Sequence, residues 1–406
     1  MSKRSIILME LSVSGITNGV TRCIEVISNG FARLSSYHII WLRLIQGQTE
    51  EIYFRCHDGY KIISLSFPRY SRTLGGNQSE QKTFLSKVYN QIKPELGDNP
   101  ILHLHTLNLI GLALYIKQIQ GCKIITHLHC IPWKGLYNRD LKLFNHLYAE
   151  YEVCPNKGQS SLCISRHEYE CFTKSDCVIC VTECGKKHVE HSCPKHIGRL
   201  LVIPNGLMDI TPDSLIVKKE VHNPVKLLFV GNPNPSKGLE DILNVLEIVM
   251  FHADVTLTVV GNFTPAKQKE IHHRHPFIDI RFVGHIPLYM LRAYYEESDI
   301  GLIASLQEQC SYAAIEMMMF GLPIVTTDID GLHELFTKEC AIKVPVVFHK
   351  QTGLRSDELK MAEAILSLIA DSYLRTQLSM NVRSHYLKHY TSSNMIRSLN
   401  KIYRTI

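Results

Sequence analysis

Short apolar runs alternate with amphipathic stretches along the first half of the chain. Apolar runs bounded by turn residues predict β-strands, and apolar positions three and four residues apart predict helices. A polar, cysteine-containing stretch at 148–172 is predicted to be irregular. The predicted strands are 5–13, 37–44, 52–66, 101–105, 123–129, 177–182 and 201–203, and the predicted helices are 21–34 and 107–120.

The alternation resumes after a polar segment, 209–223, which we predict to be a linker. Strands followed by helices in both halves predict an α/β fold with two doubly wound parallel sheets. A chain of 406 residues also exceeds the usual size of a single core. The predicted strands here are 225–231, 255–261, 280–284, 299–305 and 324–327, and the predicted helices are 239–251, 288–297, 313–320 and most of 356–406.

The most informative stretch is 304–336, ASLQEQCSYAAIEMMMFGLPIVTTDIDGLHELF. A strand ends there, a loop carries Glu308, and a short helix starting near Ser311 carries Glu316 about one turn from its start. Gly321 is a typical residue for ending that helix. Open α/β sheets bind ligands at the carboxyl ends of their strands, and a helix N-terminus there favours phosphate. We therefore expect both carboxylates to lie near a phosphate-binding crevice.

The same stretch resembles the signature of retaining glycosyltransferases of family 4. It combines E-x7-E, a small apolar helix, G-x-P, a strand and a D-x-x-G-x-x-E tail. The matching residues are Glu308, Glu316, Gly321, Pro323, Asp328, Gly331 and Glu334.

The resemblance extends over most of the chain and implies the GT-B fold, in which two Rossmann-like domains face a central cleft. It implies an acceptor-side domain at 1–212 and a nucleotide-sugar-binding domain at 213–389. The C-terminal helix, 390–406, is expected to pack back on the first domain.

The resemblance also implies roles for residues of the second domain. Glu316 would accept hydrogen bonds from the ribose hydroxyls, and Glu308 would hold hydroxyls of the sugar. Lys237 would stabilise the charge of the leaving diphosphate. The backbone amides of Ser311, Tyr312 and Ala313 would hold the diphosphate, and Ile286 would contact the base.

Two residues of the first half complete the implied site. Gly19 resembles the glycine of an N-terminal loop that faces the diphosphate. His129, at the end of KIITHLH, resembles the histidine that approaches the transferred sugar. His105, in the similar sequence ILHLH, is a weaker candidate.

The chain departs from the family pattern at two places. Gln309-Cys310-Ser311-Tyr312 replaces the common Gly-Phe-Gly-Leu, and Asn232 stands where the family often has an arginine. The first change affects the sugar pocket, since glycines allow close backbone approach. The second removes one expected cation.

The family resemblance implies that no cofactor and no metal ion is required. Asp328 and Asp330 have D-x-D spacing, which we assign to the loop after a strand rather than to a metal site. Cys177 and Cys180 have C-x2-C spacing, but residues three apart in a strand point to opposite faces. The segment 154–196, with seven cysteines and nearby histidines, remains an alternative metal-binding module.

Composition narrows the possible partners. The formal net charge of +6 is mild and suits an anionic nucleotide or peripheral contact with anionic lipid, and the unclustered Lys and Arg do not support nucleic-acid binding. Thirteen cysteines without a secretion signal, and no apolar run of transmembrane length, indicate a cytoplasmic protein with reduced thiols.

The main hypothesis is a retaining glycosyltransferase that moves a hexose from a UDP-linked donor, with GDP-linked donors as a further possibility. A glycan, a lipid-linked oligosaccharide and a peptide all remain open as acceptor. The alternatives are a non-catalytic partner subunit with the same fold and a sugar-nucleotide epimerase. Turnover of the donor would separate the enzyme from the subunit.

Overall fold

A computed structural model describes residues 3–13, 19–34, 36–47, 51–68, 78–153, 165–194, 198–211 and 221–406. The chain divides into two compact units. Unit 1 comprises Met1–Ile131, Asn156–Met208 and Ser392–Ile406, and unit 2 comprises Pro132–Pro155 and Asp209–Thr391. The division at Met208–Asp209 lies close to the expected boundary at 212, whereas the grouping of 132–155 with unit 2 differs from the expected domain limits.

Unit 1 is built on an eight-stranded sheet with the order β3-β4-β2-β1-β5-β6-β7-β8. All neighbouring strands are parallel except the β3–β4 pair at one edge. The predicted strand 52–66 is in fact a hairpin that turns at Gly59, where φ is +89°. The strands are β1 (Arg4–Val13), β2 (Tyr37–Gly47), β3 (Glu51–His57), β4 (Tyr60–Pro68), β5 (Ile101–Leu104), β6 (Lys123–Leu128), β7 (Cys177–Cys180) and β8 (Arg199–Val202).

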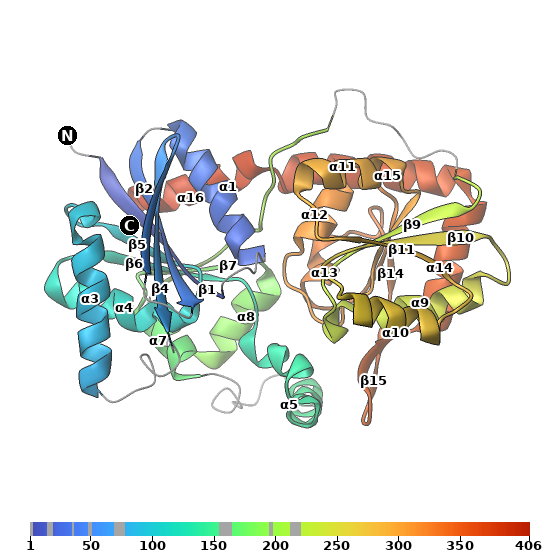
Figure 1. The fold of residues 1–406 in the computed structure, drawn as a ribbon, viewed down its shortest axis with the longest axis horizontal. Helices are drawn as coiled ribbons and strands as arrows, with labels where there is room; N and C mark the ends of the chain where they lie inside the picture. Colours follow the sequence, from blue (N-terminus) through green and yellow to red (C-terminus); the bar gives the residue numbers. More distant parts are fainter. Residues whose placement is uncertain are drawn as a thin grey trace. The chain divides into compact units, whose positions relative to one another are not determined.

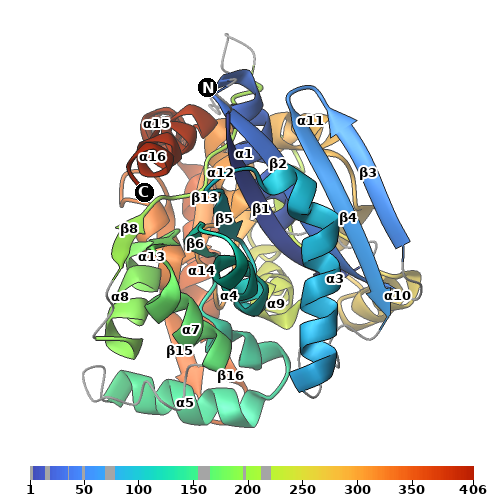
Figure 2. The ribbon, with the colours of Figure 1, turned by 90° about the vertical axis from the view of Figure 1, so that its left-hand side faces the viewer.

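Helices cover both faces of this sheet, with α1 and α16 on one face and α3 and α4 on the other (Figures 1 and 2). The prediction that 148–172 is irregular was wrong at both ends of this stretch, because both ends are helical. The segments are α1 (Gly19–Leu34), α3 (Gln78–Leu96), the 3-10 turn η1 (Leu107–Leu109), α4 (Ile110–Ile119), α7 (Arg166–Lys174), α8 (Glu183–Ser192) and α16 (Ser392–Thr405).

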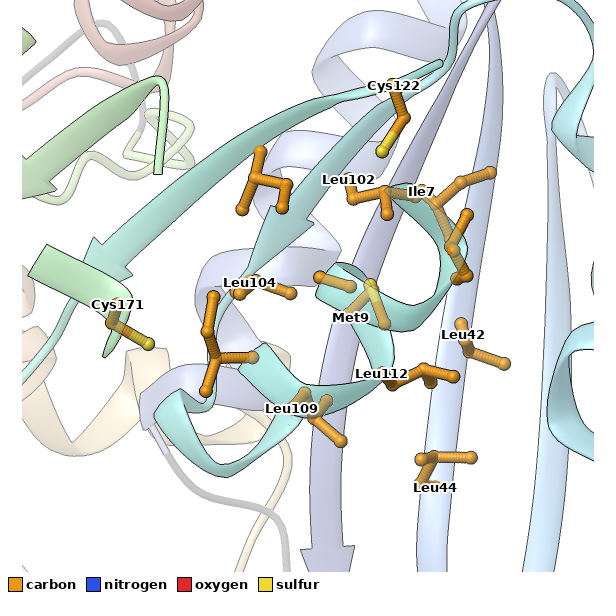
Figure 3. Close-up of a cluster of buried hydrophobic side chains, with 14 of the residues drawn as sticks. Ile7, Met9, Leu42, Leu44, Leu102, Leu104, Leu109, Leu112, Cys122 and Cys171 are labelled. Atoms are coloured by element: carbon orange, nitrogen blue, oxygen red, sulfur yellow. The ribbon is translucent and has the colours of Figure 1, made fainter. Parts of the chain in front are cut away.

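Alternation along the strands decides which side chains fill each layer. Ile7 and Met9 of β1 face α4, together with Leu102 and Leu104 of β5 (Figure 3). Because neighbouring residues in a strand point to opposite faces, His103 and His105 project from the other side of β5. The fully buried Tyr403 of α16 lies on that side and hydrogen-bonds to Nδ1 of His103 at 2.6 Å.

Unit 2 is built on a six-stranded sheet, parallel throughout, with the order β11-β10-β9-β12-β13-β14. A separate antiparallel hairpin, which the sequence analysis missed, follows it. The strands are β9 (Val225–Val230), β10 (Val255–Val260), β11 (Asp279–Gly284), β12 (Ile300–Ile303), β13 (Ile324–Thr327), β14 (Ile342–Val344), β15 (Val346–His349) and β16 (Gly353–Ser356).

Figure 1 shows α9 and α10 on one side of this sheet and α11 and α12 on the other. Two doubly wound sheets, parallel except at the β3–β4 edge of unit 1, confirm the predicted fold class. Within the described ranges, no helix has the length and apolar character needed to cross a bilayer. The segments are η2 (Pro132–Asn138), α5 (Leu141–Val153), η3 (Pro235–Lys237), α9 (Leu239–Val249), α10 (Pro265–Arg274), α11 (Leu288–Glu297), α12 (Tyr312–Met319), α13 (Asp330–Leu335), α14 (Glu358–Ala370) and α15 (Ser372–His389).

Candidate active site

The strand order of unit 2 identifies the position of a ligand site. From β9 the chain moves outward through β10 to β11, and it then returns to the other side of β9 to form β12. Ligands of open α/β sheets bind outside the carboxyl ends of the strands at such a switch point. The loops that follow β9 and β12 are therefore the structural candidates, and they carry Lys237 and Glu308.

These two loops contact each other closely. The backbone N–H of Leu306 donates to the carbonyl of Ser236 at 2.7 Å. Gly238 has φ +69°, and a Cβ atom there would lie 2.0 Å from the carbonyl oxygen of Ala304. A side chain at this position would push the loops apart, so the glycine is required both by its backbone conformation and by the available space.

Lys237 and Glu308 form an ion pair between Nζ and Oε2. The lysine side chain is 32% exposed and the glutamate side chain 15% exposed, so the pair remains partly open to solvent. The structure thus brings together two of the residues expected to act in catalysis. The Lys237 ammonium has three N–H donors, so it can contact an anion while one of them is paired with Glu308.

The N-terminus of α12 follows directly after this pair. Ser311 is the N-cap, and its hydroxyl accepts from the N–H of Ala314 at 3.4 Å. Tyr312 and Ala313, the first two helical residues, have N–H groups that cannot bond within the helix. Three residues of the predicted diphosphate site therefore lie at a helix N-terminus, where an anion is favoured.

Glu316 lies one turn into α12, as the sequence analysis predicts. Its side chain is buried, and Oε2 accepts a hydrogen bond from the hydroxyl of Tyr295 on α11. Tyr295 is fully buried and stacks on Phe320 at a centroid distance of 5.1 Å. Its role as a partner of Glu316 carried no recognisable sequence signal.

Ile286 follows β11 in the loop between that strand and α11, and it is half-buried. Gly284, at the end of β11, has φ +83° and accepts from the N–H of Gly261 at 3.0 Å. This bond fixes the loop after β11 to the loop after β10. Asn232, after β9, accepts from the N–H of Asn262 at 3.2 Å, so the residue that replaces the expected arginine ties the loops after β9 and β10 together.

A second ion pair close to Glu308 was missed by the sequence analysis. Lys134 of η2 pairs with Asp330 at the start of α13, with side chains 8% and 7% exposed. Asp330 has φ +47°, which is unusual for a residue with a side chain. The next residue, Gly331, donates its N–H to the carbonyl of Glu308 at 2.9 Å. Lys134 therefore supports the Glu308 loop through the backbone of Asp330–Gly331.

The two aspartates of the D-x-D sequence have separate partners. Asp328 is paired with Nδ1 of His333 at 2.7 Å and with Lys343 at 3.3 Å, while Asp330 is paired with Lys134. Burial alone would raise the pKa of the Asp328 carboxyl, but these partners outweigh burial and lower it.

In unit 1, Gly19 is the exposed first residue of α1, and the preceding residues 14–18 lie outside the described ranges. His129 follows β6, and its Nε2 lies 2.9 Å from Nδ1 of His105. Burial lowers the pKa of His129 to about 4, so the ring is neutral near pH 7. His129 is thus one member of a histidine cluster rather than an isolated residue.

The cysteines of the segment 154–196 are not gathered around a common point in the described part of the chain. Cys177 and Cys180 are both buried in β7, and burial raises the pKa of Cys177 to about 11. Cys154 and Cys163 lie outside the described residues. Within the described ranges, the side chains grouped closely enough to hold a metal ion are Cys23, His105, His127 and His129.

Comparison with known proteins gives a family match to part of the chain and a fold match to nearly all of it. Residues 224–371, which contain Lys237, Glu308 and α12, match the family described as Glycosyl transferases group 1. The chain has the GT-B fold, and the matched part, which lies within unit 2, is similar to this glycosyltransferase family. The fold is similar to that of sucrose-phosphate synthase from Thermosynechococcus elongatus, with a TM-score of 0.73 and 15% identity. The match covers 99% of this chain and 98% of the other.

The chain is also similar to a structure solved with a nucleotide sugar and to a yeast protein. HepE from Anabaena, solved in complex with UDP-glucose, has a TM-score of 0.67 and 14% identity, with 99% of this chain and all of the other covered. The phosphatidylinositol N-acetylglucosaminyltransferase GPI3 subunit of Saccharomyces cerevisiae is 22% identical over 284 residues. That match covers 67% of this chain and 60% of the yeast protein, so the chain spans about three fifths of that relative.

Proposed function

We propose that this GT-B protein is a retaining glycosyltransferase that transfers a hexose from a nucleotide diphosphate sugar, UDP-linked by preference, to a hydroxyl acceptor. The observation that carries the proposal is the Lys237–Glu308 pair, which joins the two loops at the switch point beside the N-terminus of α12. The solved complex of HepE with UDP-glucose supports the choice of donor.

The proposed chemistry is electrostatic. As the bond between sugar and diphosphate breaks, negative charge grows on the leaving phosphate. Lys237 and the N–H groups of Tyr312 and Ala313 would stabilise that charge. Glu308 would orient Lys237 and accept hydrogen bonds from sugar hydroxyls. The leaving phosphate itself would accept the acceptor's proton, so the proposal needs no nucleophilic side chain and no metal ion.

The remaining residues would position the donor and the acceptor. Glu316, held at Oε2 by the hydroxyl of Tyr295, would accept hydrogen bonds from the ribose, and Ile286 would contact the base. Gly19 and His129 would contribute from unit 1. The acceptor would be a glycan, a lipid-linked oligosaccharide or a peptide. The enzyme would act in the cytoplasm, and the net charge of +6 supports peripheral contact with an anionic membrane surface.

The test is release of free nucleotide from a panel of UDP-, GDP-, ADP- and TDP-sugars, with Lys237→Ala and Glu308→Gln compared with the unaltered protein. We expect one donor to be turned over and each variant to lose about 10²–10³-fold in kcat, the usual cost of losing one preorganised charge-stabilising group. The matched controls are Lys267→Ala and Glu270→Gln, which break an exposed ion pair on α10 and should leave turnover unchanged.

A second function is favoured by particular observations. Asn232 and Gln309-Cys310-Ser311-Tyr312 depart from the family pattern, and the yeast relative is named a subunit. A non-catalytic partner subunit would bind UDP in a thermal-shift assay and lose that binding in Lys237→Ala, yet release no nucleotide from any donor, with or without a cell-envelope acceptor. UDP binding without any nucleotide release would contradict the proposal of an enzyme and support a non-catalytic subunit.

A further inference from the structure

Four side chains of unit 1 converge at the ends of two central strands. His105 follows β5, His127 and His129 stand at the end of β6, and Cys23 lies on the second turn of α1. One potential ligand atom from each residue lies within 4.8 Å of all the others. Cys23, His105 and His127 are buried, and His129 is half-buried, so the group opens toward solvent only at His129.

The pairing of the strands explains why the histidines meet. β5 and β6 are parallel neighbours, with His103 opposite Ile125 and Leu104 opposite Thr126. Residues two apart along each strand share a face, so the H-x-H sequences at 103–105 and 127–129 project toward α1 and α16. The rings of His127 and His129 stack at 4.3 Å, and those of His105 and His129 at 5.2 Å.

The hydrogen bonding of this cluster is incomplete. Nδ1 of His105 and Nε2 of His129 share one contact of 2.9 Å. Within the described parts of the chain, both ring nitrogens of His127 and Nε2 of His105 are buried without a hydrogen-bond partner. Buried polar atoms without partners are rare in native proteins and call for an explanation such as an ion.

The types of these side chains suit a metal ion. Zinc in proteins is bound by histidine nitrogen and cysteine sulfur, and structural zinc sites are closed by four such ligands. Three histidines and one cysteine supply four ligand atoms here.

We propose that Cys23, His105, His127 and His129 bind one zinc ion. Tetrahedral zinc has nitrogen and sulfur ligands at about 2.0–2.3 Å, which places neighbouring ligand atoms about 3.3–3.8 Å apart. The side chains would therefore close in by about 1 Å from the 4.8 Å spread seen here. The Cys23 thiol gives up its proton to solvent as its sulfur binds the metal.

The ion would tie α1 to the ends of β5 and β6 and so stabilise unit 1. His129 would bind through one nitrogen, which leaves its other N–H able to donate and fixes the orientation of the ring. All ligands belong to unit 1, so the proposal stands whether or not the protein transfers sugars. It concerns four residues outside the cysteine-rich segment 154–196.

The first experiment measures zinc by mass spectrometry in untagged full-length protein purified from zinc-supplemented cells, followed by chelation and titration with Co²⁺. We expect about one zinc per chain and a thiolate-to-cobalt charge-transfer band. Zinc should also raise the melting temperature of the chelated protein. Less than about a tenth of an equivalent of metal, with no cobalt band, would overturn the proposal.

Variants locate the ion. Cys23→Ser should abolish the charge-transfer band, and His127→Gln should lower zinc content at least tenfold. Cys130→Ser and His191→Gln alter an exposed cysteine and an exposed histidine and should retain the metal. Zinc that persists in folded Cys23→Ser with an intact cobalt band would refute the site. If His127→Gln fails to fold, the cobalt spectra of the unaltered protein and of Cys23→Ser still decide.

Discussion

At the scale of single residues, the buried Lys134–Asp330 pair combines two costs. Both charges are removed from water, and Asp330 adopts φ +47°, a conformation that costs a residue other than glycine on the order of 1 kcal/mol or more. Such a conformation persists only when its surroundings hold it in place, and it is often found at functional sites. Here it presents the N–H of Gly331 to the carbonyl of Glu308.

We predict that Asp330→Asn lowers the free energy of unfolding by about 3 kcal/mol, because it leaves the ammonium group of Lys134 buried without a counter-charge. Asparagine tolerates positive φ, so the change isolates the charge from the backbone conformation. Urea denaturation measures the effect. The double variant Lys134→Met/Asp330→Asn should recover most of the loss, and a double variant that is less stable than either single one would contradict this account.

At the scale of elements, Asp176 connects three parts of unit 1. It directly precedes β7, and its Oδ2 accepts from the N–H of Ile124 in β6 and from Lys117 on α4, both at 2.9 Å. Burial alone would raise the pKa of Asp176, but these donors outweigh burial and lower the pKa of its carboxyl from the usual value. The charged form is therefore stabilised by folding.

We expect Asp176→Ala to cost about 2 kcal/mol at pH 7, the range for a hydrogen-bonded charge. Since the pKa is lower in the folded state, the contribution is fully present above the unfolded value near 4 and is lost as the pH falls through the lower folded value. The stability gap between the two proteins should narrow below about pH 4. A gap that is constant between pH 6 and pH 3 in denaturant titrations would show that the charge is unimportant.

Local pattern accounts for the elements that could be predicted. The central strands β9 (VKLLFV) and β12 (IGLI) of unit 2 are largely apolar, and α12 is bounded by Ser311 before it and by Gly321 with φ +60° after it. The helix α3 was missed because its polar surface hides its periodicity, and the hairpin β15–β16 was missed because its strands are only four residues long.

Site residues were predictable where they belong to a local stretch that resembles the family pattern. Glu308 and Glu316 share one such stretch, and Lys237 lies in a second one, 71 residues from Glu308. Lys134 and Asp330, by contrast, are 196 residues apart, and nothing near either one indicates the other. The same holds for Cys23, whose approach to His127 depends on how α1 packs on the sheet.

At the scale of the whole molecule, α16 completes unit 1 although it is separated from the rest of that unit by Asp209–Thr391. It buries Met395, Ile396, Leu399, Ile402 and Tyr403. At about 1.5–3 kcal/mol for each large apolar side chain, this burial is comparable to the 5–15 kcal/mol that usually separates a folded domain from its unfolded state.

We therefore predict that ending the chain after Thr391 abolishes cooperative unfolding of unit 1 and lowers soluble yield. Leu399→Ala should cost about 2–5 kcal/mol. Arg397→Ala, on the exposed side of the same helix, should change stability by less than about 0.5 kcal/mol. Calorimetry of the three proteins provides the measurement, and a truncated chain that still melts in two sharp transitions would disprove the prediction.

The interleaving of the two units has a consequence for synthesis on the ribosome. The apolar face of α1 is made early, but α16, the helix that covers it, begins only at Ser392, roughly 360 residues after α1 ends at Leu34. At about 5–20 residues per second, that face waits about 20–70 s for its cover. During this interval the nascent chain carries an open hydrophobic surface, which makes it a natural client for chaperones that shield incomplete domains.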